Sequence, residues 1–389
     1  MEIHRRWLSR PRVVVGAMSG TSCDGVDAAM VRLHHHRGRI KIELLSTANV
    51  EFSLPFRKAL LNATEGHLTV EELAELGIVL MDYYRRAIAE SIEYAGISPD
   101  AVGVHGQTLW HAPVGNVRWG IKCRTTFQLA VPAVLAAAFS VPVVSDVRTT
   151  DIILGGQGAP LVPILDWELL RNPTKYIIAL NIGGIANITL LPPTASFENL
   201  IAFDTGPGNV WIDYAMQRYW GKRYDVGGTT AASGQIVPHL AAQLQKIDYV
   251  TVPPPKSTGR ELFSQQMIEE LIRPLDRTLI PAEDIITTLT WFTAWSIAEN
   301  IRRYATDQAT IVVSGGGAHN ATLLAMLQQE LPAAHIIRLT DYCSIPEQAK
   351  EAVLIAYIAY RTLGGLPSNI PSVTGASRPA ILGSITPPP

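Results

Sequence analysis

Four segments rich in Gly, Ser, Thr, Asn and Asp follow apolar runs, and the first of them could bind phosphate. The first, residues 18–27, reads MSGTSCDGVD and directly follows the apolar residues 13–15. Small residues let backbone N–H groups approach an anion closely. A P-loop would continue into a helix, whereas residues 26–31 alternate like a second strand. We therefore expect a β-hairpin that holds phosphate, with an ordinary hairpin turn as the alternative. Its candidate nucleotide-binding residues are Ser19, Gly20, Thr21, Ser22, Cys23, Asp24, Gly25 and Val26.

The three other glycine-rich segments also follow apolar runs. Residues 176–190 again read as strand, turn and strand, which predicts two similar lobes. Residues 204–209 (DTGPGN) precede a helix-like stretch, whose N-terminus would favour phosphate. Residues 314–320 (SGGGAHN) open another helix, where a base or ribose could lie against bare backbone. The candidate nucleotide-binding residues in these last two segments are Gly206, Gly208, Asn209, Gly315, Gly316 and Gly317.

Two carboxylates lie within these segments. Asp204 ends an apolar strand immediately before the second phosphate loop, where a carboxylate could act as a general base near a γ-phosphate. The alternative is that Asp204 only caps the following turn or helix. Asp24 could hold Mg²⁺ through water or could satisfy its own turn as an Asx residue.

Several further polar residues follow predicted strands and could bind a sugar. The stretch His105-Gly106-Gln107-Thr108 lies in a predicted loop after residues 101–104, and Arg148 could pair with a substrate carboxylate. Each residue alone could be structural, but together they favour a binding site. The candidate substrate-binding residues are Gln107, Thr108, Asp146, Arg148, Asn181, Gly183 and Glu351.

The elements around these segments predict an α/β fold. Strands are expected at residues 13–18, 26–33, 40–47, 101–104 and 141–144, and helices at 69–94, 283–304, 318–331 and 346–363. A meander followed by crossover helices is typical of an α/β lobe. We expect a first lobe at residues 1–150, joined by part of 365–389, and a second lobe at 151–364. The tail from residue 367 is rich in Pro and Ser and is expected to be irregular.

Composition narrows the classes of partner. The chain has 389 residues, of which 47% are hydrophobic and 17% charged, enough to bury one large or two moderate cores. Its net charge of -2 offers no electrostatic footprint for nucleic acid. The apolar run 129–144 contains Pro132, Ser140 and Pro142 and is too short to span a membrane. Three isolated cysteines, Cys23, Cys123 and Cys343, predict neither disulfides nor a zinc site. These features favour a cytoplasmic protein without membrane or nucleic-acid partners.

The order of the phosphate hairpin, the Asp-led loop and the Gly-Gly-Gly loop resembles the actin-like ATPase and sugar kinase superfamily. Seven segments resemble the anhydro-N-acetylmuramic acid kinase family: MSGTSCDGVD, HGQTLWH, VVSDVRTTDIILGGQGAPLVP, NIGGIANIT, FDTGPGNV, KSTGRELF and SGGGAHN.

This resemblance implies two ribonuclease-H-like lobes with an interlobe cleft, and ATP with Mg²⁺ as cofactors. It implies phosphorylation of 1,6-anhydro-N-acetylmuramic acid in cell-wall recycling, with Asp204 as the catalytic residue. A homodimer is a further expectation. Two alternatives remain open: an ordinary hydroxyl-directed sugar kinase, and an ATPase of the actin or chaperone type without metabolic turnover.

Overall fold

The computed structural model describes residues 2–20, 22–36, 38–259, 262–277 and 280–389. The chain forms two compact units. The first combines Met1–Leu169 with Gln348–Pro389, and the second comprises Leu170–Glu347. These limits differ from the expected ones, because residues 151–169 and 348–364 belong to the first unit.

A six-stranded sheet lies at the centre of the first unit, in the order β13-β7-β4-β1-β2-β3. Its strands are β1 (Arg12–Met18), β2 (Gly25–His36), β3 (Arg39–Glu51), β4 (Ala101–Val104), β7 (Val143–Ser145) and β13 (Ser384–Thr386). Strands β1 and β2 form an antiparallel hairpin that pairs Met18 with Asp27, whereas β4 runs parallel to β1. The first hairpin is thus confirmed, and helices make the crossovers that parallel strands require.

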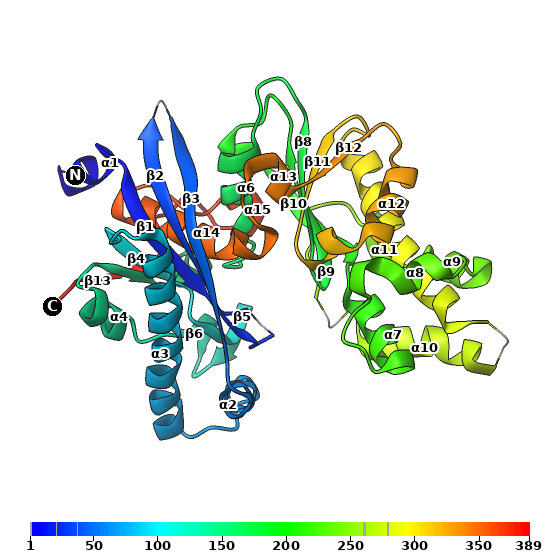
Figure 1. The fold of residues 1–389 in the computed structure, drawn as a ribbon, viewed down its shortest axis with the longest axis horizontal. Coiled ribbons are helices and arrows are strands. Elements are labelled where there is room, and N and C mark those ends of the chain that lie inside the picture. Colours follow the sequence, from blue (N-terminus) through cyan, green and yellow to red (C-terminus); the bar gives the residue numbers. More distant parts are fainter. Residues whose placement is uncertain (1, 21, 37, 260–261, 278–279) are drawn as a thin grey trace. The chain divides into compact units, whose positions relative to one another are not determined.

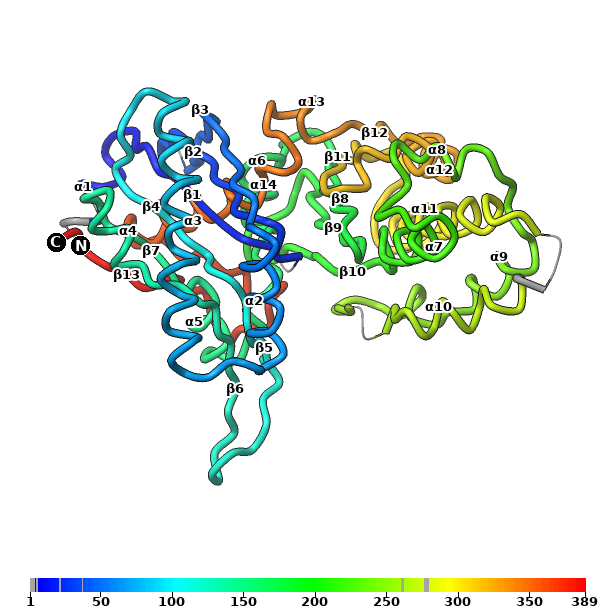
Figure 2. The backbone as a smooth tube through the Cα atoms, turned by 60° about the horizontal axis from the view of Figure 1, so that its bottom comes forward, coloured from blue at the N-terminus to red at the C-terminus, as the bar shows by residue number. Residues whose placement is uncertain are grey.

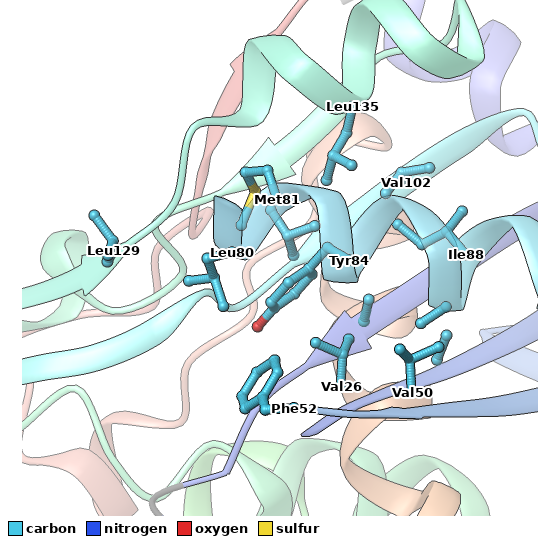
Figure 3. Packing of buried hydrophobic residues seen from close by; sticks show 14 of the residues in the cluster. Val26, Val50, Phe52, Leu80, Met81, Tyr84, Ile88, Val102, Leu129 and Leu135 are labelled. Carbon is cyan, nitrogen blue, oxygen red and sulfur yellow. The ribbon is translucent and has the colours of Figure 1, made fainter. Parts of the chain in front are cut away.

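Two long helices cover opposite faces of this sheet: α3 (Val70–Ala95) and α14 (Lys350–Leu363) (Figure 1). Helix α3 begins with a capping box between Thr69 and Glu72. Its apolar side chains pack against the sheet, and Figure 3 shows Tyr84 close to Phe52 and Val26. The other helices of this unit are α1 (Glu2–Leu8), α2 (Leu54–Thr64), α4 (Pro132–Phe139), α5 (Thr149–Ile153), α6 (Val162–Leu170) and α15 (Pro371–Thr374).

Helix α14 approaches the sheet very closely because two strand residues are glycines. A Cβ atom on Gly16 of β1 would collide with the backbone of Ala352 and Ala356. A Cβ atom on Gly103 of β4 would lie 2.7 Å from the carbonyl oxygen of Ile355. Both strands therefore need glycine at the point where the helix crosses them.

A second, two-stranded sheet of the first unit forms a long hairpin from β5 (Gln107–Arg118) and β6 (Ile121–Leu129). Figure 2 shows its far end projecting away from the rest of the unit. The turn residues Trp119 and Gly120 both have positive φ, as a two-residue hairpin turn requires. The prediction that Gln107 and Thr108 lie in a loop is wrong, since both begin β5.

The second unit contains a five-stranded sheet in the order β10-β9-β8-β11-β12. Its strands are β8 (Ile177–Ile182), β9 (Ile185–Leu191), β10 (Ile201–Pro207), β11 (Thr310–Ser314) and β12 (His335–Arg338). Three antiparallel strands are followed by two parallel ones, the same order as β3-β2-β1-β4-β7 in the first unit. The prediction of two similar α/β lobes is confirmed.

A helical region with its own apolar core surrounds Trp211, Phe263 and Phe292 in the second unit. Most of it was not predicted, because its helices are short and separated by irregular stretches. The α-helices of the unit are α7 (Val210–Trp220), α8 (Thr229–Ser233), α9 (Pro238–Leu244), α10 (Gln265–Ile272), α11 (Ala282–Tyr304), α12 (Ala321–Glu330) and α13 (Leu339–Cys343). Short 3₁₀ turns are η1 (Phe197–Asn199), η2 (Val226–Gly228), η3 (Asp248–Thr251), η4 (Arg273–Arg277), η5 (Gly316–His319) and, at the junction with the first unit, η6 (Glu347–Ala349).

The C-terminal segment is more ordered than expected. Strand β13 pairs Ile385 with Val144 and extends the first sheet, and α15 precedes it. The buried carboxylate of Asp151 accepts hydrogen bonds from Asn369 Nδ2 and Thr374 Oγ1, both at 2.7 Å. The prediction of an irregular tail is therefore wrong in these parts, because contacts with the sheet order a segment of low intrinsic propensity.

Candidate active site

A cavity of about 270 Å³ opens in the first unit. It is lined by Met18, Ser19, Gly20, Ser22, His105, Gln107, Thr108, Arg148 and Glu351. The structure thus brings together four of the predicted substrate residues, Gln107, Thr108, Arg148 and Glu351, with part of the first hairpin turn. Asp146 is not in this lining; its Oδ1 accepts a hydrogen bond from Thr149 N at the start of α5.

Gln107 ties the hairpin turn to β5. Ser19 Oγ donates to Gln107 Oε1 at 2.7 Å, and Gln107 Nε2 donates to the carbonyl oxygen of Gly20 at 3.3 Å. Gln107 is almost fully buried, so losing either bond would leave a buried polar group unpaired. This pair holds one wall of the cavity in place.

Arg148 and His105 form a second buried pair. Arg148 Nε donates to His105 Nε2 at 2.9 Å and Arg148 Nη1 donates to the carbonyl oxygen of Gly158 at 2.8 Å. A guanidinium only donates, so His105 Nε2 must be an acceptor, and Nδ1 carries the proton donated to the carbonyl of Gly106. Burial, reinforced by the nearby Arg148 charge, lowers the pKa of His105 to about 3. The histidine is therefore neutral and fixes the direction of the Arg148 side chain.

The buried neutral His105 should make the protein acid-sensitive. Its pKa is about 6.5 in the unfolded chain and about 3 in the folded one, so the unfolded state gains the proton first as the pH falls through this window. Stability is therefore lost between pH 6.5 and 3. The free energy of unfolding of the unmodified protein should fall by a His105 contribution on the order of 3 kcal/mol between pH 7 and pH 4. This contribution should be absent from His105→Gln, whose Oε1 can still accept a hydrogen bond from Arg148.

Urea denaturation at pH 4, 5, 6 and 7 measures this effect. His239→Gln, at an exposed position of α9, is the matched control and should follow the original curve. If the His105→Gln curve also runs parallel to that of the unmodified protein, the buried-histidine interpretation is wrong.

Two carboxylates near the cavity, Glu351 and Asp27, have raised pKa values. Glu351, in the first turn of α14, lines the cavity and is reached by solvent there. The surrounding protein raises the pKa of Glu351, the Arg148 charge opposes this shift and Asp27 adds to it. Burial also raises the pKa of Asp27, although Asn49 Nδ2 donates to its carboxylate at 2.8 Å. This end of the hairpin thus carries negative charge that a bound cation would stabilise.

The turn of the first hairpin divides its residues between surface and core. Cys23 and Val26 are fully buried in the apolar core, so only their backbone could face a ligand. Asp24 forms an ion pair with Arg57 at 2.8 Å. A Cβ on Gly25 would lie 2.6 Å from the carbonyl oxygen of Val50, so glycine is needed there for packing against β3. Thr21 lies outside the described residues.

Asp204 sits at a bulge within β10 of the second unit. The strand does not end at Asp204, as predicted, but shifts register between Asp204 and Gly206 and continues to Pro207. Its Oδ2 accepts hydrogen bonds from Thr258 N at 2.8 Å and from Ser257 Oγ at 3.1 Å. The N-cap of α7 is Asn209, so the alternative that Asp204 caps this helix does not hold. The bulge changes the direction in which the Asp204 side chain leaves the strand, and the two hydrogen bonds hold its carboxylate in place.

Lys256 anchors the segment that holds Asp204. Its buried Nζ donates to the carbonyl oxygens of Tyr249 and Val250, at 3.1 and 3.0 Å, and lies over the rings of Phe203 and Tyr249. Burial lowers the pKa of Lys256 to about 8. Residues 256–258 were not among the predicted site residues, although the Lys-Ser-Thr-Gly segment was the available signal.

The loop after Asp204 is bonded to the turn of the second hairpin. The N–H groups of Gly208, Asn209 and Val210 donate to the carbonyls of Gly183 and Gly184, at 2.8 to 3.1 Å. The N–H groups of Gly208 and Asn209, which were expected to bind phosphate, are therefore used within the protein. Asn181 and Gly183, predicted to bind sugar, lie beside this loop at the β8–β9 turn.

A second cavity, of about 440 Å³, opens in the second unit. It is lined by Asn209, Ile212, Asp213, Tyr224, Asp225, Val226, Gly227, Gly316, His319 and Asn320. Of the three predicted adenosine-loop glycines, only Gly316 faces it. A Cβ on Gly315 would lie 2.7 Å from the carbonyl of Ile182, and one on Gly317 would collide with the Ile182 side chain. Gly315 and Gly317 are therefore needed for packing, whereas Gly316 borders open space.

The repeated sheet and its glycine-rich turns define the class of this protein. Both units share one strand order, and in each a β-hairpin turn lies beside a polar cavity or loop. This is the α/β fold of the actin-like ATPases and sugar kinases.

Sequence comparison identifies the family. The family model described as anhydro-N-acetylmuramic acid kinase matches residues 12–388. A relative from Caldanaerobacter subterraneus, named anhydro-N-acetylmuramic acid kinase, is 37% identical over 96% of this chain and 97% of its own. A relative of the same name from Synechococcus elongatus is 39% identical over 96% of this chain and 98% of its own. The chain belongs to the anhydro-N-acetylmuramic acid kinase family and is a kinase.

Solved structures with similar arrangements have low sequence identity. The activator of 2-hydroxyisocaproyl-CoA dehydratase from Clostridium difficile, with bound ADPNP, matches with a TM-score of 0.46 and 11% identity, over 91% of this chain and 96% of that one. A ROK family glucokinase from Streptomyces griseus, in complex with glucose and AMPPNP, matches with a TM-score of 0.39 and 15% identity, over 89% and 98%. Within the described ranges, no helix has the length and hydropathy needed to cross a membrane.

Proposed function

We propose that this protein is an ATP-dependent kinase that opens 1,6-anhydro-N-acetylmuramic acid and phosphorylates its O6, giving N-acetylmuramic acid 6-phosphate in cell-wall recycling. The observation that carries the proposal is the family match over residues 12–388. The cytoplasm is the proposed location, because ATP is available there.

The first cavity is the proposed sugar site. An anhydromuramic acid offers hydroxyl, acetamido and carboxylate groups, and the lining offers matching donors and acceptors from Gln107, Thr108 and Arg148. Arg148 is the natural partner for the carboxylate, because its guanidinium is already oriented by His105 and Gly158. Glu351 is then available for a sugar hydroxyl or the reacting water.

The second cavity is the proposed adenosine site. Gly316 has no side chain that would fill the cavity from its side. The exposed side chains of Tyr224 and Val226 offer apolar surface to a base. Asn209 and Asp213 provide polar groups for a ribose. Gly206 and Gly208 keep the neighbouring loop compact. The N–H groups of residues 208–210 are already bonded to the second hairpin, so other groups of this loop would bind phosphate.

Asp204 is the proposed general base. It takes a proton from a water whose oxygen forms a bond to C1, while the C1–O6 bond of the anhydro bridge breaks. The freed O6 forms a bond to the γ-phosphorus, and the bond between that phosphorus and ADP breaks. Thr258 N–H and Ser257 Oγ hold one carboxylate oxygen in position, so the base is oriented before the substrate arrives.

Mg²⁺ would neutralise charge on the triphosphate. Among the residues that the structure describes, no group of three or more His, Cys, Asp or Glu side chains could hold a metal by itself. This fits Mg²⁺, which needs only one or two carboxylates besides phosphate oxygens and water. Asp24 is already paired with Arg57, whereas the hydrogen-bond donor to the Asp27 carboxylate is the neutral amide of Asn49. We therefore favour Asp27 over Asp24 as the carboxylate that would hold Mg²⁺, directly or through water.

Isotopic water tests the coupled reaction. In H₂¹⁸O, the label should appear at C1 of the first-formed product and be absent from the transferred phosphate, provided the product is trapped before ring opening exchanges the anomeric hydroxyl. Label in the phosphate, or equal phosphorylation of free N-acetylmuramic acid, would favour an ordinary sugar kinase. ADP release that does not depend on the anhydrosugar would instead favour an ATPase of the actin or chaperone type.

A further inference from the structure

A buried ion pair joins α6 to the first turn of α14, and these two helices lie side by side (Figures 1 and 2). Lys350 Nζ lies 2.7 Å from Asp166 Oδ1, and the two side chains are only 5% and 4% exposed. Lys350 is the first residue of α14, and the next residue is Glu351, which lines the first cavity. Lys350 itself is not part of that lining. The pair is therefore adjacent to the proposed sugar site without belonging to it.

Helix stability does not account for Lys350. The N-terminus of a helix carries a partial positive charge, which disfavours a cation in the first turn. Taking two charges out of water is also costly, and apolar residues of similar volume often replace a buried ion pair without loss of stability. A residue that conflicts with local stability in this way is expected where function requires it.

Contacts on two sides fix the first turn of α14. Its N-cap residue, Ala349, makes no side-chain capping bond, so the turn depends on tertiary contacts. On one side the backbone of Ala352 packs so closely against Gly16 of β1 that no Cβ would fit there. On another side Lys350 is held by α6. Successive helical side chains point about 100° apart, so the two contacts together set the direction in which Glu351 leaves the helix.

A second bond joins the same two helices further along α14. Tyr357 Oη donates to Glu168 Oε2 at 2.8 Å, while Glu168 Oε1 accepts a hydrogen bond from Ile40 N at 2.9 Å. Tyr357 lies about two helical turns beyond Lys350. This bond ties α6 to α14 without being next to Glu351, so it provides a comparison for the ion pair.

We propose that Lys350 is a positioning residue for the kinase reaction: its ion pair with Asp166 keeps the Glu351 carboxylate directed into the sugar site. The inference rests on the proposed function, in which the first cavity holds the anhydrosugar. There Glu351 would accept a hydrogen bond from a sugar hydroxyl or from the reacting water. A carboxylate that is already oriented loses less conformational freedom when the substrate binds.

The charge of Lys350 also favours the ionised form of Glu351. Loss of hydration within the protein raises the pKa of Glu351; Arg148, the N-cap residue of α5, opposes this shift, Asp27 of β2 adds to it, and Lys350 opposes it. His105, which also lines the cavity, is neutral. Without the Lys350 charge, the pKa of Glu351 would rise further. The carboxylate would then be protonated at a higher pH as the solution is acidified.

Steady-state kinetics of the full chain tests the proposal. The double variant Lys350→Met/Asp166→Asn removes both charges together, so no uncompensated charge is left buried. Its kcat/KM for the anhydrosugar should fall by about tenfold. Between pH 8 and pH 5, the loss of kcat/KM on acidification should begin at a higher pH than in the unmodified protein. Tyr357→Phe, which removes a bond between the same helices, is the matched control and should leave kcat/KM and its pH dependence unchanged.

A double-mutant cycle with Glu351 shows whether Lys350 acts through it. Glu351→Gln should itself lower kcat/KM, and adding it to the double variant should produce little further loss. Losses that simply multiply, or an unchanged kcat/KM in the folded double variant, would overturn the inference but leave the sugar site in place. An unchanged kcat/KM in Glu351→Gln would overturn the proposed sugar site as well.

Thermal unfolding of each variant separates a folding defect from a loss of position. If the double variant does not fold, Asp166→Asn alone provides the test, because asparagine keeps the shape of the side chain and leaves Lys350 in place. Its kcat/KM should also fall, and the fall should be small in the presence of Glu351→Gln. Multiplying losses in these folded variants contradict the inference.

Discussion

Asp204→Asn should lower kcat by a factor on the order of 10² to 10⁴ while leaving the affinity for ATP nearly unchanged. The carboxamide oxygen can still accept the hydrogen bonds that Thr258 N and Ser257 Oγ give to Asp204 Oδ2. The bulge in β10 should therefore keep its shape. What the side chain loses is the ability to take a proton from the attacking water. Steady-state ADP release gives kcat, and calorimetric titration with a non-hydrolysable ATP analogue gives the affinity.

Ser257→Ala provides the matched comparison for this variant. It removes one of the two hydrogen bonds that orient Asp204 but leaves the base itself, so kcat should fall by no more than about tenfold. If Asp204→Asn retains nearly full turnover, Asp204 is not the base. If it loses ATP binding together with kcat, the carboxylate has a structural role in the nucleotide site.

Gly316→Val should raise the apparent KM for ATP by at least about tenfold, equivalent to roughly 1.4 kcal/mol of binding, with little change in the KM for the anhydrosugar. A Cβ at this position meets nothing closer than Asn209 Nδ2 at 3.7 Å, so the backbone tolerates a side chain. The two methyl groups of valine would then project into the second cavity, where we place adenosine. Steady-state kinetics with each substrate varied separately measures the two KM values.

Two further glycine substitutions separate this effect from misfolding. Gly316→Ala adds only an ordinary contact and should change the KM for ATP less than Gly316→Val does. Gly317→Ala should lower the melting temperature, because its Cβ collides with Ile182. An equal rise in both KM values for Gly316→Val, accompanied by a lower melting temperature, would show that Gly316 is a packing residue and not a wall of the nucleotide site.

The sequence predicted the elements that are specified locally. The strands around residues 13–18 and 101–104 and the helix at 283–304 follow from apolar periodicity and from glycine-rich turns. The β-hairpin of β1 and β2 was predicted because the residues after Gly25 alternate, and the structure has this hairpin. The repeat of one strand order in both units could also be predicted, since each unit begins with a similar hairpin.

Features that depend on distant contacts were missed. Strand β13 has little apolar character and is ordered by pairing with Val144 across more than two hundred residues. Lys256 anchors the segment beside Asp204 through hydrogen bonds to Tyr249 and Val250 and a contact with the ring of Phe203, which no sequence spacing reveals. His105 was expected in a polar loop, and its burial and its bond to Arg148, which give it a defined tautomer, were not foreseen. The use of the 208–210 N–H groups by the second hairpin could likewise be seen only in three dimensions.

The discontinuity of the first unit has a consequence for synthesis on the ribosome. The second unit is inserted between Leu169 and Gln348, so the whole of it is synthesised before α14. Until α14 arrives, the face of the first sheet around Val14 and Val31, buried in the finished protein, has no cover. The N-terminal part of the first unit, Met1–Leu169, must therefore remain incomplete while the second unit buries its own core. Released chains that end at residue 349 should thus contain a protease-resistant second unit joined to a protease-sensitive first one.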